Sequence, residues 1–492
     1  MLTNREAGVL LHITSLTGDE GIGTLGKGAF GFIDWLSENG FSIWQVLPLC
    51  HAGYAQSPYL ALSAFAGNPL MIDLRICEQY YNVSLNLKAI EFKSSIDFES
   101  CYSDKLPLLK KFADSVKTSL ISNNEFIEFC NNESYWLKDY SLFAAFREKF
   151  NKEAFEELPL NFRLREAKTL EALTKSLADE MLFYKIVQFE FFRQWNELRT
   201  YAASKGIKIM GDLPIYMAYD SCEVWRFPEL FSVNEELLLT EVAGVPPDYF
   251  SETGQLWGNP VYKWENHKAQ NYEWWKMRMK KTLAMFDLIR IDHFRAFASY
   301  WEIPAGSEDA VNGKWVTGPG MDFFNNVISQ AENDRIIAED LGVISEDVVT
   351  LLKELGFPGM KVIQFAFDES NGNTHKPHFY PVNSIVYTGT HDNDTLAGWL
   401  NEQDDESIER ICKYFACEKD DFFGSIIRAC IASVAAVCIL PMQDILELGS
   451  EARMNIPGTS EGNWKWRMNE NYVKSKTTEK ISGMLEIYER KR

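Results

Sequence analysis

Short apolar runs that end in polar, Gly or Pro residues recur eight times along the chain, and they constrain its fold more than any other feature. Their apolar residues do not follow a strict alternation, which is typical of strands buried on both faces of a parallel sheet. Because helix-like stretches lie between the runs, the sequence predicts a (β/α)8 TIM barrel of parallel strands. The runs are GVLLHITSL (8–16), SIWQVLPL (42–49), IKIMGDLPIY (207–216), LIRIDHF (288–294), RIIAEDLG (335–342), MKVIQFAFD (360–368), SIVYTGTHD (384–392) and VCILPMQD (437–444).

Helix start and stop signals are clear in two of the intervening stretches. The amphipathic segment 27–40 ends at Gly40, a residue favoured just after a helix. The segment 345–356 opens with a Ser, carries acids in its first turn and closes on Gly356, the expected polarity of a helix. A longer helix-like segment, 182–206, predicts a helix that leads into the third strand.

Two intervals are too long for a simple βα unit. Residues 75–180, between the second and third strands, predict a helical insertion subdomain, and residues 217–285 predict a loop insertion over the mouth of the barrel. No internal repeat, low-complexity tract or Pro/Ser-rich linker divides the chain. We therefore expect residues 1–492 to form a single barrel with these two insertions and no separate C-terminal β-domain.

The composition excludes several classes of protein. The chain has 492 residues, 49 Lys plus Arg against 70 Asp plus Glu, and a net charge of −21, which argues against nucleic-acid binding. Nine cysteines without a C-x-x-C pair favour a reducing cytoplasmic location. The N-terminus shows no signal-peptide cleavage site. The longest apolar run, 429–442, is shorter than the roughly 18–20 residues that span a membrane, so we expect no membrane association.

Acidic residues stand at or just past the ends of six of the predicted strands. In a closed barrel those ends converge on one face, where active sites are built. A strand-end or helix-capping role is the favoured interpretation for Asp444 and an equally good one for Asp368. Several carboxylates that converge with histidines are costly to bury and indicate a functional site. The six are Asp212, Asp292, Glu339, Asp368, Asp392 and Asp444.

Carboxylates with histidines admit two main chemistries, a metal site or glycosyl transfer by paired acids. The chain has seven His and no H-E-x-x-H motif, and the H-x-x-H of His375 and His378 lies in a polar loop, so we expect neither a metal nor a cofactor. Glycoside chemistry needs one acid to attack the anomeric carbon and another to protonate the leaving oxygen. The high aromatic content, 14%, suits stacking on sugar rings.

Several of these motifs resemble a known family. RIDHFR, AEDLG and GTHDN are similar to conserved regions of the α-amylase clan. The longer pieces SPYLALSAFAGNPLMIDL (57–74), GDLPIYMAYDSCEVW (211–225), GVPPDYFSETGQLWGNPVYKW (244–264) and NIPGTSEGNWKWR (455–467) resemble amylomaltases, the 4-α-glucanotransferases (disproportionating enzymes) of glycoside hydrolase family 77. The resemblance runs from about residue 6 to the C-terminus. It is weakest in 75–180, where ELPLNFRLREAKTL lacks the Trp that family members often carry before L-R-x-R.

The resemblance implies a role for each acid. Asp292 would be the nucleophile, Glu339 the general acid/base and Asp392 the transition-state stabiliser. Arg290, two residues before Asp292, should point to the same side of the strand and keep that carboxylate ionised. Glu339 needs a raised pKa, which burial and neighbouring acids would supply.

The remaining candidate residues would contact substrate. The resemblance implies that His293 and His391 bind sugar hydroxyls, and that Asp212 supports Arg290 or the sugar at the reacting bond. The aromatic candidates for glucan contacts have packing within loops as an equally plausible interpretation. The candidate glucan contacts are Tyr59, Tyr249, Phe250, Trp257, Asn463 and Trp464.

The reaction implied is a retaining double displacement on α-1,4-glucans and maltooligosaccharides. With the 4-OH of another glucan as acceptor it is a 4-α-glucanotransferase, and with water as acceptor an α-glucan hydrolase of the same clan. The catalytic acids alone do not decide between transferase and hydrolase. The choice depends on acceptor binding and on the exclusion of water, and we expect the loop 247–258 to provide both. A catalytically inactive glucan-binding protein, and a metal-dependent phosphoesterase that uses Asp392 and His391, are alternatives from other classes.

Overall fold

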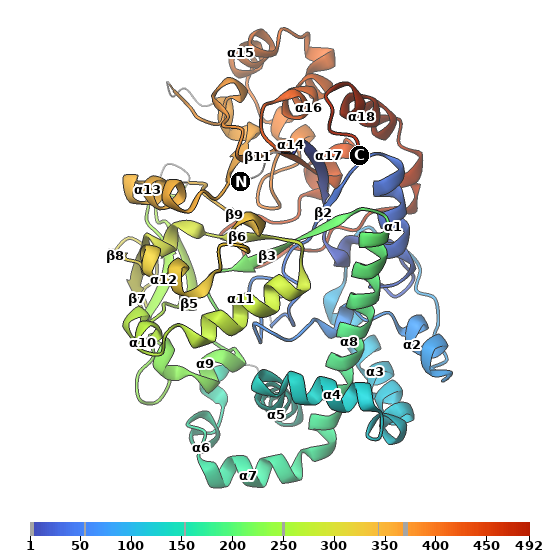
Figure 1. The fold of residues 1–492 in the computed structure, drawn as a ribbon, viewed down its shortest axis with the longest axis vertical. Coiled ribbons are helices and arrows are strands. Elements are labelled where there is room, and N and C mark those ends of the chain that lie inside the picture. The colour runs from blue at the N-terminus through green and yellow to red at the C-terminus, as the bar shows by residue number, and fades with distance from the viewer. Residues whose placement is uncertain (1–3, 54–55, 152–153, 248–250, 343, 368–371) are drawn as a thin grey trace.

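Eight parallel strands form the centre of the computed structural model, which describes residues 4–53, 56–151, 154–247, 251–342, 344–367 and 372–492 (Figure 1). Their order in the sheet is β10-β11-β12-β1-β2-β3-β6-β9. The backbone N–H of Ala338 on the last strand donates to Pro358 O at 3.0 Å, just before the first, so the sheet curls back on itself. The predicted (β/α)8 barrel is confirmed. Its strands are β1 (Glu6–Leu10), β2 (Ile43–Gln45), β3 (Lys208–Pro214), β6 (Leu288–Asp292), β9 (Ile336–Ala338), β10 (Gly359–Val362), β11 (Ser384–Tyr387) and β12 (Val437–Pro441).

Each of the eight predicted runs overlaps one barrel strand. The strands are shorter than the runs, because the chain turns away at the polar residues that end each run. The two helices with clear stop signals end as predicted: α1 before Gly40 at φ +83°, and α13 before Gly356 at φ +69°, both conformations that favour glycine. The helices around the barrel are α1 (Lys27–Glu38), α8 (Ala178–Ser204), α11 (Glu273–Met285), α12 (Gly320–Val327), α13 (Glu346–Leu355), α14 (Leu396–Asn401), α15 (Asp405–Phe415), α16 (Phe422–Ala432), α17 (Met442–Ile445) and α18 (Lys476–Ile487).

The interval 75–180 is made of helices, and Figure 1 shows α4–α7 together at one end of the molecule. Asp73, Asp97 and Asn123 accept backbone N–H bonds at the starts of α2, α3 and α4, which explains where these helices begin. Buried Lys105 donates to Glu20 Oε2 at 2.7 Å and ties α3 to the barrel. The helices are α2 (Leu74–Tyr81), α3 (Phe98–Leu120), α4 (Asn124–Asn132), α5 (Ser134–Phe150), α6 (Leu160–Arg163) and α7 (Ala167–Ser176).

A second sheet, which the sequence did not predict, stands beside the barrel. It has four antiparallel strands in the order β5-β4-β7-β8, two from the interval 217–285 and two from the segment after β6. Long loops were expected in 217–285, but the segment also contains α9 (Cys222–Arg226), α10 (Trp264–Ala269) and α11. The strands are β4 (Glu241–Val245), β5 (Gln255–Pro260), β7 (Ser299–Pro304) and β8 (Lys314–Thr317).

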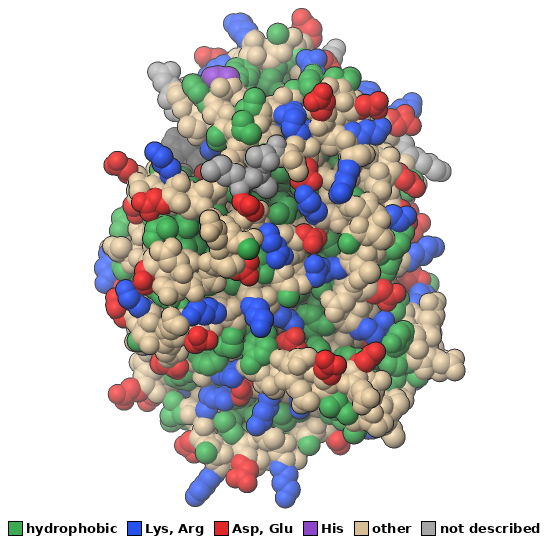
Figure 2. All heavy atoms as spheres, in the orientation of Figure 1, with side chains coloured by type: hydrophobic (Ala, Val, Ile, Leu, Met, Phe, Trp, Pro, Cys, Tyr) green, Lys and Arg blue, Asp and Glu red, His purple; other side chains and the backbone are tan. Residues whose placement is uncertain are grey.

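Surface charge and helix hydropathy both bear on the sequence-based expectations. On the face drawn in Figure 2, acidic and basic side chains are interspersed over the surface. Among the helices that the structure describes, none is both long and apolar enough to cross a membrane.

The chain end closes the barrel on the side of the strand starts. Arg490 is 1% exposed and donates to five backbone carbonyl oxygens that lie before β1 and β12 or within them. A buried guanidinium with five donors can satisfy many carbonyls at once, so this single side chain fixes the C-terminal segment to the sheet. The acceptors are the oxygens of Ile431, Ser433, Ala435, Ala436 and Glu6, at 2.6–3.1 Å.

We predict that Arg490→Met lowers the free energy of unfolding by about 3 kcal/mol, because it leaves buried carbonyls without donors. Urea unfolding followed by tryptophan fluorescence measures this. The control, Lys491→Met on the adjacent exposed position, should change it by less than about 0.5 kcal/mol. Equal stabilities of the two variants would contradict the anchoring role.

Candidate active site

Charged side chains gather at the C-terminal ends of the barrel strands, as predicted. Asp212 on β3 is the register partner of Arg290 on β6, and Pro214 is the partner of Asp292. On the other side of β6, Ile291 pairs with Ala338, so Glu339 stands next to the end of β6. The parallel register thus brings three acids and one arginine from adjacent strands to one place.

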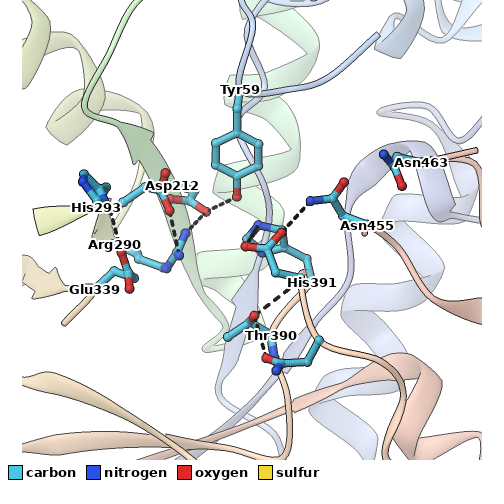
Figure 3. A network of polar contacts seen from close by, with 12 residues as sticks. Tyr59, Asp212, Arg290, His293, Glu339, Thr390, His391, Asn455 and Asn463 are labelled. Atoms are coloured by element: carbon cyan, nitrogen blue, oxygen red, sulfur yellow. Dashed lines mark hydrogen bonds and ion pairs between the residues drawn. The ribbon is translucent and has the colours of Figure 1, made fainter. Parts of the chain in front are cut away.

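Arg290 is the centre of this group. It is 3% exposed, and it donates to Asp212 Oδ2 at 2.6 Å and to Asp292 Oδ1 at 2.8 Å. Because side chains two residues apart point to the same face of a strand, Arg290 and Asp292 meet as the sequence predicted. Asp212 also accepts a hydrogen bond from the Tyr59 hydroxyl at 2.7 Å, and Figure 3 shows Tyr59, Asp212 and Arg290 joined.

The carboxylate of Glu339 is held by backbone N–H groups. Its Oε2 accepts from His293 N at 2.7 Å and its Oε1 accepts from Leu341 N at 2.8 Å. His293 has φ +51°, a left-handed conformation that is unusual for a side-chain-bearing residue. Strain of this kind is concentrated at functional sites, and here it turns the His293 N–H toward Glu339.

Burial and the Arg290 cation act in opposite directions on the pKa values of Asp292 and Glu339. Burial raises the pKa of Asp292 and of Glu339, and the Arg290 cation acts against this at both. The two backbone N–H bonds also lower the pKa of Glu339. Arg290 contacts Asp292 directly and not Glu339, and this direct contact favours the ionised form of Asp292. One ionised and one protonated carboxyl is the division that acid-assisted displacement needs.

Asp392 lies beyond the end of β11 and is 41% exposed in its side chain. Its Oδ1 accepts from Asn455 Nδ2 at 2.6 Å, and its Oδ2 lies 3.4 Å from His391 Nε2. Arg453 donates to its backbone oxygen at 2.7 Å. The carboxylate is therefore oriented from two sides while one part of it remains open to solvent.

The two histidines of the site are uncharged at neutral pH; His391 is buried and His293 is partly buried. Burial, together with the nearby Arg295 cation, lowers the pKa of His293 to about 3. Burial also lowers the pKa of His391, although Asp392 acts in the opposite direction. A neutral imidazole offers one donor and one acceptor, which suits hydrogen bonding to uncharged hydroxyl groups.

Three predicted aromatic contacts also lie at the site. The Tyr59 ring stacks on His391, with centroids 5.1 Å apart and an interplanar angle of 17°. The Trp464 ring lies 5.7 Å from Tyr59, and the Trp257 ring meets His293 edge-on at 4.7 Å. The rings thus pack against the two histidines of the site, Tyr59 on His391 and Trp257 on His293.

Of three other predicted contacts, Asn463 forms its hydrogen bonds within its own loop, and two lie outside the residues that the structure describes. Asn463 uses its amide within its own loop, since Oδ1 accepts from Ile456 N and Nδ2 donates to Thr459 O, both at 3.0 Å. Figure 3 draws it apart from the hydrogen-bonded group. Tyr249 and Phe250 lie outside the described residues, as does the strand-end acid Asp368.

Asp444, the remaining strand-end acid, has structural partners. Its Oδ1 accepts from Leu396 N at 2.7 Å, at the start of α14, and its Oδ2 accepts from the Thr388 hydroxyl. Burial raises its pKa to about 6. These bonds agree with the favoured interpretation of Asp444 as a strand-end and helix-capping group.

Sequence reasoning missed the residues that hold Asp392. Asn455 follows Asp392 by 63 positions and Arg453 follows it by 61, and neither stands at a strand end. The one signal was that Asn455 opens the motif NIPGTSEGNWKWR (455–467). Within the described residues, no group of three or more His, Cys, Asp or Glu side chains is placed to hold a metal ion.

Comparisons with known proteins show which family the chain is similar to. A family model described as 4-alpha-glucanotransferase matches residues 11–473. The chain is 44% identical to a 4-alpha-glucanotransferase of Synechocystis, over 100% of this chain and 99% of that protein, and 43% identical to one of Aquifex aeolicus, over 99% of each. Among solved structures it is similar to an amylomaltase from Streptococcus agalactiae in complex with acarbose, with a TM-score of 0.96, 36% identity and coverage of 99% and 100%.

We predict that Glu339→Gln gains stability relative to the wild type as the pH rises from 4 to 7. Because the pKa of Glu339 is raised in the folded state, the folded protein holds this proton more tightly than the unfolded chain. Wild-type stability is therefore lost as the pH rises above the unfolded pKa and through the folded pKa, and a glutamine avoids this loss. Urea unfolding of both proteins at the two pH values measures the difference.

The matched control is Glu461→Gln, on an exposed loop. Its stability relative to the wild type should be the same at both pH values. A Glu339→Gln variant with an equally flat profile would show that burial does not raise the pKa of Glu339.

Proposed function

We propose that Asp292, Glu339 and Asp392 carry out the reaction of this chain. The chain belongs to glycoside hydrolase family 77 and is a 4-alpha-glucanotransferase. Its substrates are α-glucans, and we propose α-1,4-linked glucans and maltooligosaccharides as both donor and acceptor. The observation that supports the proposal most strongly is the contact of one buried cation, Arg290, with Asp292, beside an acid that does not share this contact.

In the first step, an Asp292 carboxylate oxygen attacks the anomeric carbon of the donor. Glu339 gives its proton to the glycosidic oxygen, whose bond to that carbon breaks, and the shortened glucan leaves with a new hydroxyl group. The product is a covalent glucosyl-enzyme with inverted configuration at this carbon. Arg290 supports the step by favouring the ionised form of Asp292.

In the second step, the Glu339 carboxylate takes a proton from the 4-hydroxyl of an acceptor glucan. The acceptor oxygen attacks the same carbon, the bond to Asp292 breaks, and the second inversion restores the original configuration. Asp392 stabilises the positive charge that develops on the sugar in both steps. Neutral His293 and His391 bind sugar hydroxyls without competing for that charge.

We further propose that the barrel acts as one catalytic unit of residues 1–492. The helical insertion 75–180 is tied to it by Lys105 and Glu20. The insertion 217–285 lies over the mouth, where Trp257 reaches His293. No observation favours a hydrolase or an inactive glucan-binding protein over the transferase.

We predict that incubation with maltotriose gives glucose together with a ladder of longer oligosaccharides. Hydrolysis alone would give only shorter products, so chromatography of the products tests transfer directly. Glu339→Gln should slow the reaction roughly 10²–10⁴-fold, the range expected for loss of a general acid.

The control for Glu339→Gln is a donor that needs no protonation, such as an α-glucosyl fluoride. Formation of the covalent intermediate from it should be slowed much less than cleavage of maltotriose. Unchanged disproportionation of maltotriose by Glu339→Gln would exclude Glu339 as the acid/base.

We predict that Trp257→Ala raises the ratio of hydrolysis to transfer several-fold, because loss of the ring beside His293 opens the mouth to water. Glucose released per longer oligosaccharide formed from maltotriose measures this ratio. Trp257→Phe, which keeps an aromatic ring there, is the control and should stay near the wild-type ratio. If Trp257→Ala slowed both reactions equally, the ring would have no part in excluding water.

A further inference from the structure

Trp315, on β8 of the antiparallel sheet, is the most exposed of the fourteen tryptophans. Its side chain and backbone together are 44% exposed, although burial of a tryptophan ring is strongly favourable. The surrounding positions 311, 312, 314 and 317 are exposed as well. Figure 1 shows β8 at the outer edge of this sheet, where one side of the strand has no neighbour.

Neighbouring side chains hold the Trp315 ring in place. The guanidinium carbon of Arg295 lies over the ring, 4.0 Å from its centroid, and the Trp301 ring packs against it at 5.2 Å with an interplanar angle of 66°. Trp301 is itself fixed, since its Nε1 donates to Ala310 O at 2.8 Å. The ring is therefore backed by a cation and an aromatic edge, and it presents its remaining surface to solvent.

Arg295 connects this ring to the active site. It lies in the turn η5 (Phe294–Phe297), three residues after Asp292, and is 5% exposed. The charge of Glu339 acts on the Arg295 cation, which places the guanidinium within electrostatic reach of the catalytic acids. The strand β7 then continues from this turn, and Ser299 pairs with Thr317 of β8. Trp315 thus contacts a residue, Arg295, of the short turn that follows the end of β6.

We propose that Trp315 stacks on a glucose unit of a long α-glucan outside the catalytic cleft, as an outer binding site that favours long over short chains. This inference rests on the proposed function. The apolar C–H face of a pyranose matches one exposed indole face, and the ring needs no reordering because its neighbours already fix it.

The size and charge of the surface favour this occupant. One ring with the exposed side chain of Val311 beside it is far smaller than the roughly 800 Å² per partner that a stable protein interface buries. The two charged residues on β7 and β8, Glu302 and Lys314, pair with each other at 3.0 Å, and Arg295 is covered by the Trp315 ring and is 5% exposed. A neutral sugar chain that continues from the cleft fits both features.

The experiment compares Trp315→Ala with the wild type on maltotriose and on amylose. The variant should keep its kcat/KM on maltotriose, whereas its KM for amylose should rise roughly 3- to 10-fold, as the loss of one stacking contact implies. Trp315→Tyr, which keeps a ring, should restore most of the affinity. Phe379→Ala removes a ring that is 50% exposed, from the turn Pro377–Phe379, and should change neither value.

Retardation in gels that contain amylose provides a readout independent of turnover. Trp315→Ala should migrate faster than the wild type in such gels, and the same difference should persist in a Glu339→Gln background. An equal loss on both substrates, or unchanged KM and retardation with amylose, would overturn the outer site. Failure of the wild type to disproportionate maltotriose would instead overturn the proposed function, and the gels would still decide on Trp315.

Discussion

The pairing of one buried cation with two carboxylates governs the active site. Arg290 has lost almost all contact with water, which would be costly for an unpaired guanidinium, and Asp212 and Asp292 compensate for this loss. The pairing requires β3 and β6 to be in parallel register, because Asp212 and Arg290 are direct strand partners. The catalytic geometry is thus a consequence of strand register, and a shift by one residue would turn Arg290 away from the acids.

A second buried arginine stabilises the opposite end of the same barrel. The hydrogen bonds of Arg490 go to backbone carbonyl oxygens, whereas Arg290 meets two carboxylates, and burial raises the pKa of one of them, Asp292. The barrel therefore separates stability from chemistry. At the strand starts Arg490 binds neutral backbone carbonyl groups, and at the strand ends Arg290 and the acids hold charges that do not favour folding. This arrangement lets the acids remain reactive without unfolding the sheet that carries them.

Local patterns were sufficient to predict the barrel and its acids. Strand runs, glycine stops such as Gly356, and an acid directly after a run are all short-range signals, and barrel closure converts them into a three-dimensional site. The partners of Asp392 could not be found in this way, because Asn455 reaches it from a loop that no periodicity describes. The motif around Asn463 predicted a glucan contact for this residue. In the structure its amide forms hydrogen bonds within its own loop.

The antiparallel sheet escaped prediction for a related reason, since β4 and β7 pair across the whole of β6 and the intervening helices. This long-range pairing nevertheless has a functional consequence. Because β7 leaves the turn that follows Asp292, the β7–β8 hairpin is positioned by the same strand, β6, that carries Asp292. The proposed sugar-binding ring of Trp315 is therefore held at a fixed offset from Asp292. A rigid offset of this kind can measure the length of a polymer, whereas a mobile loop could not.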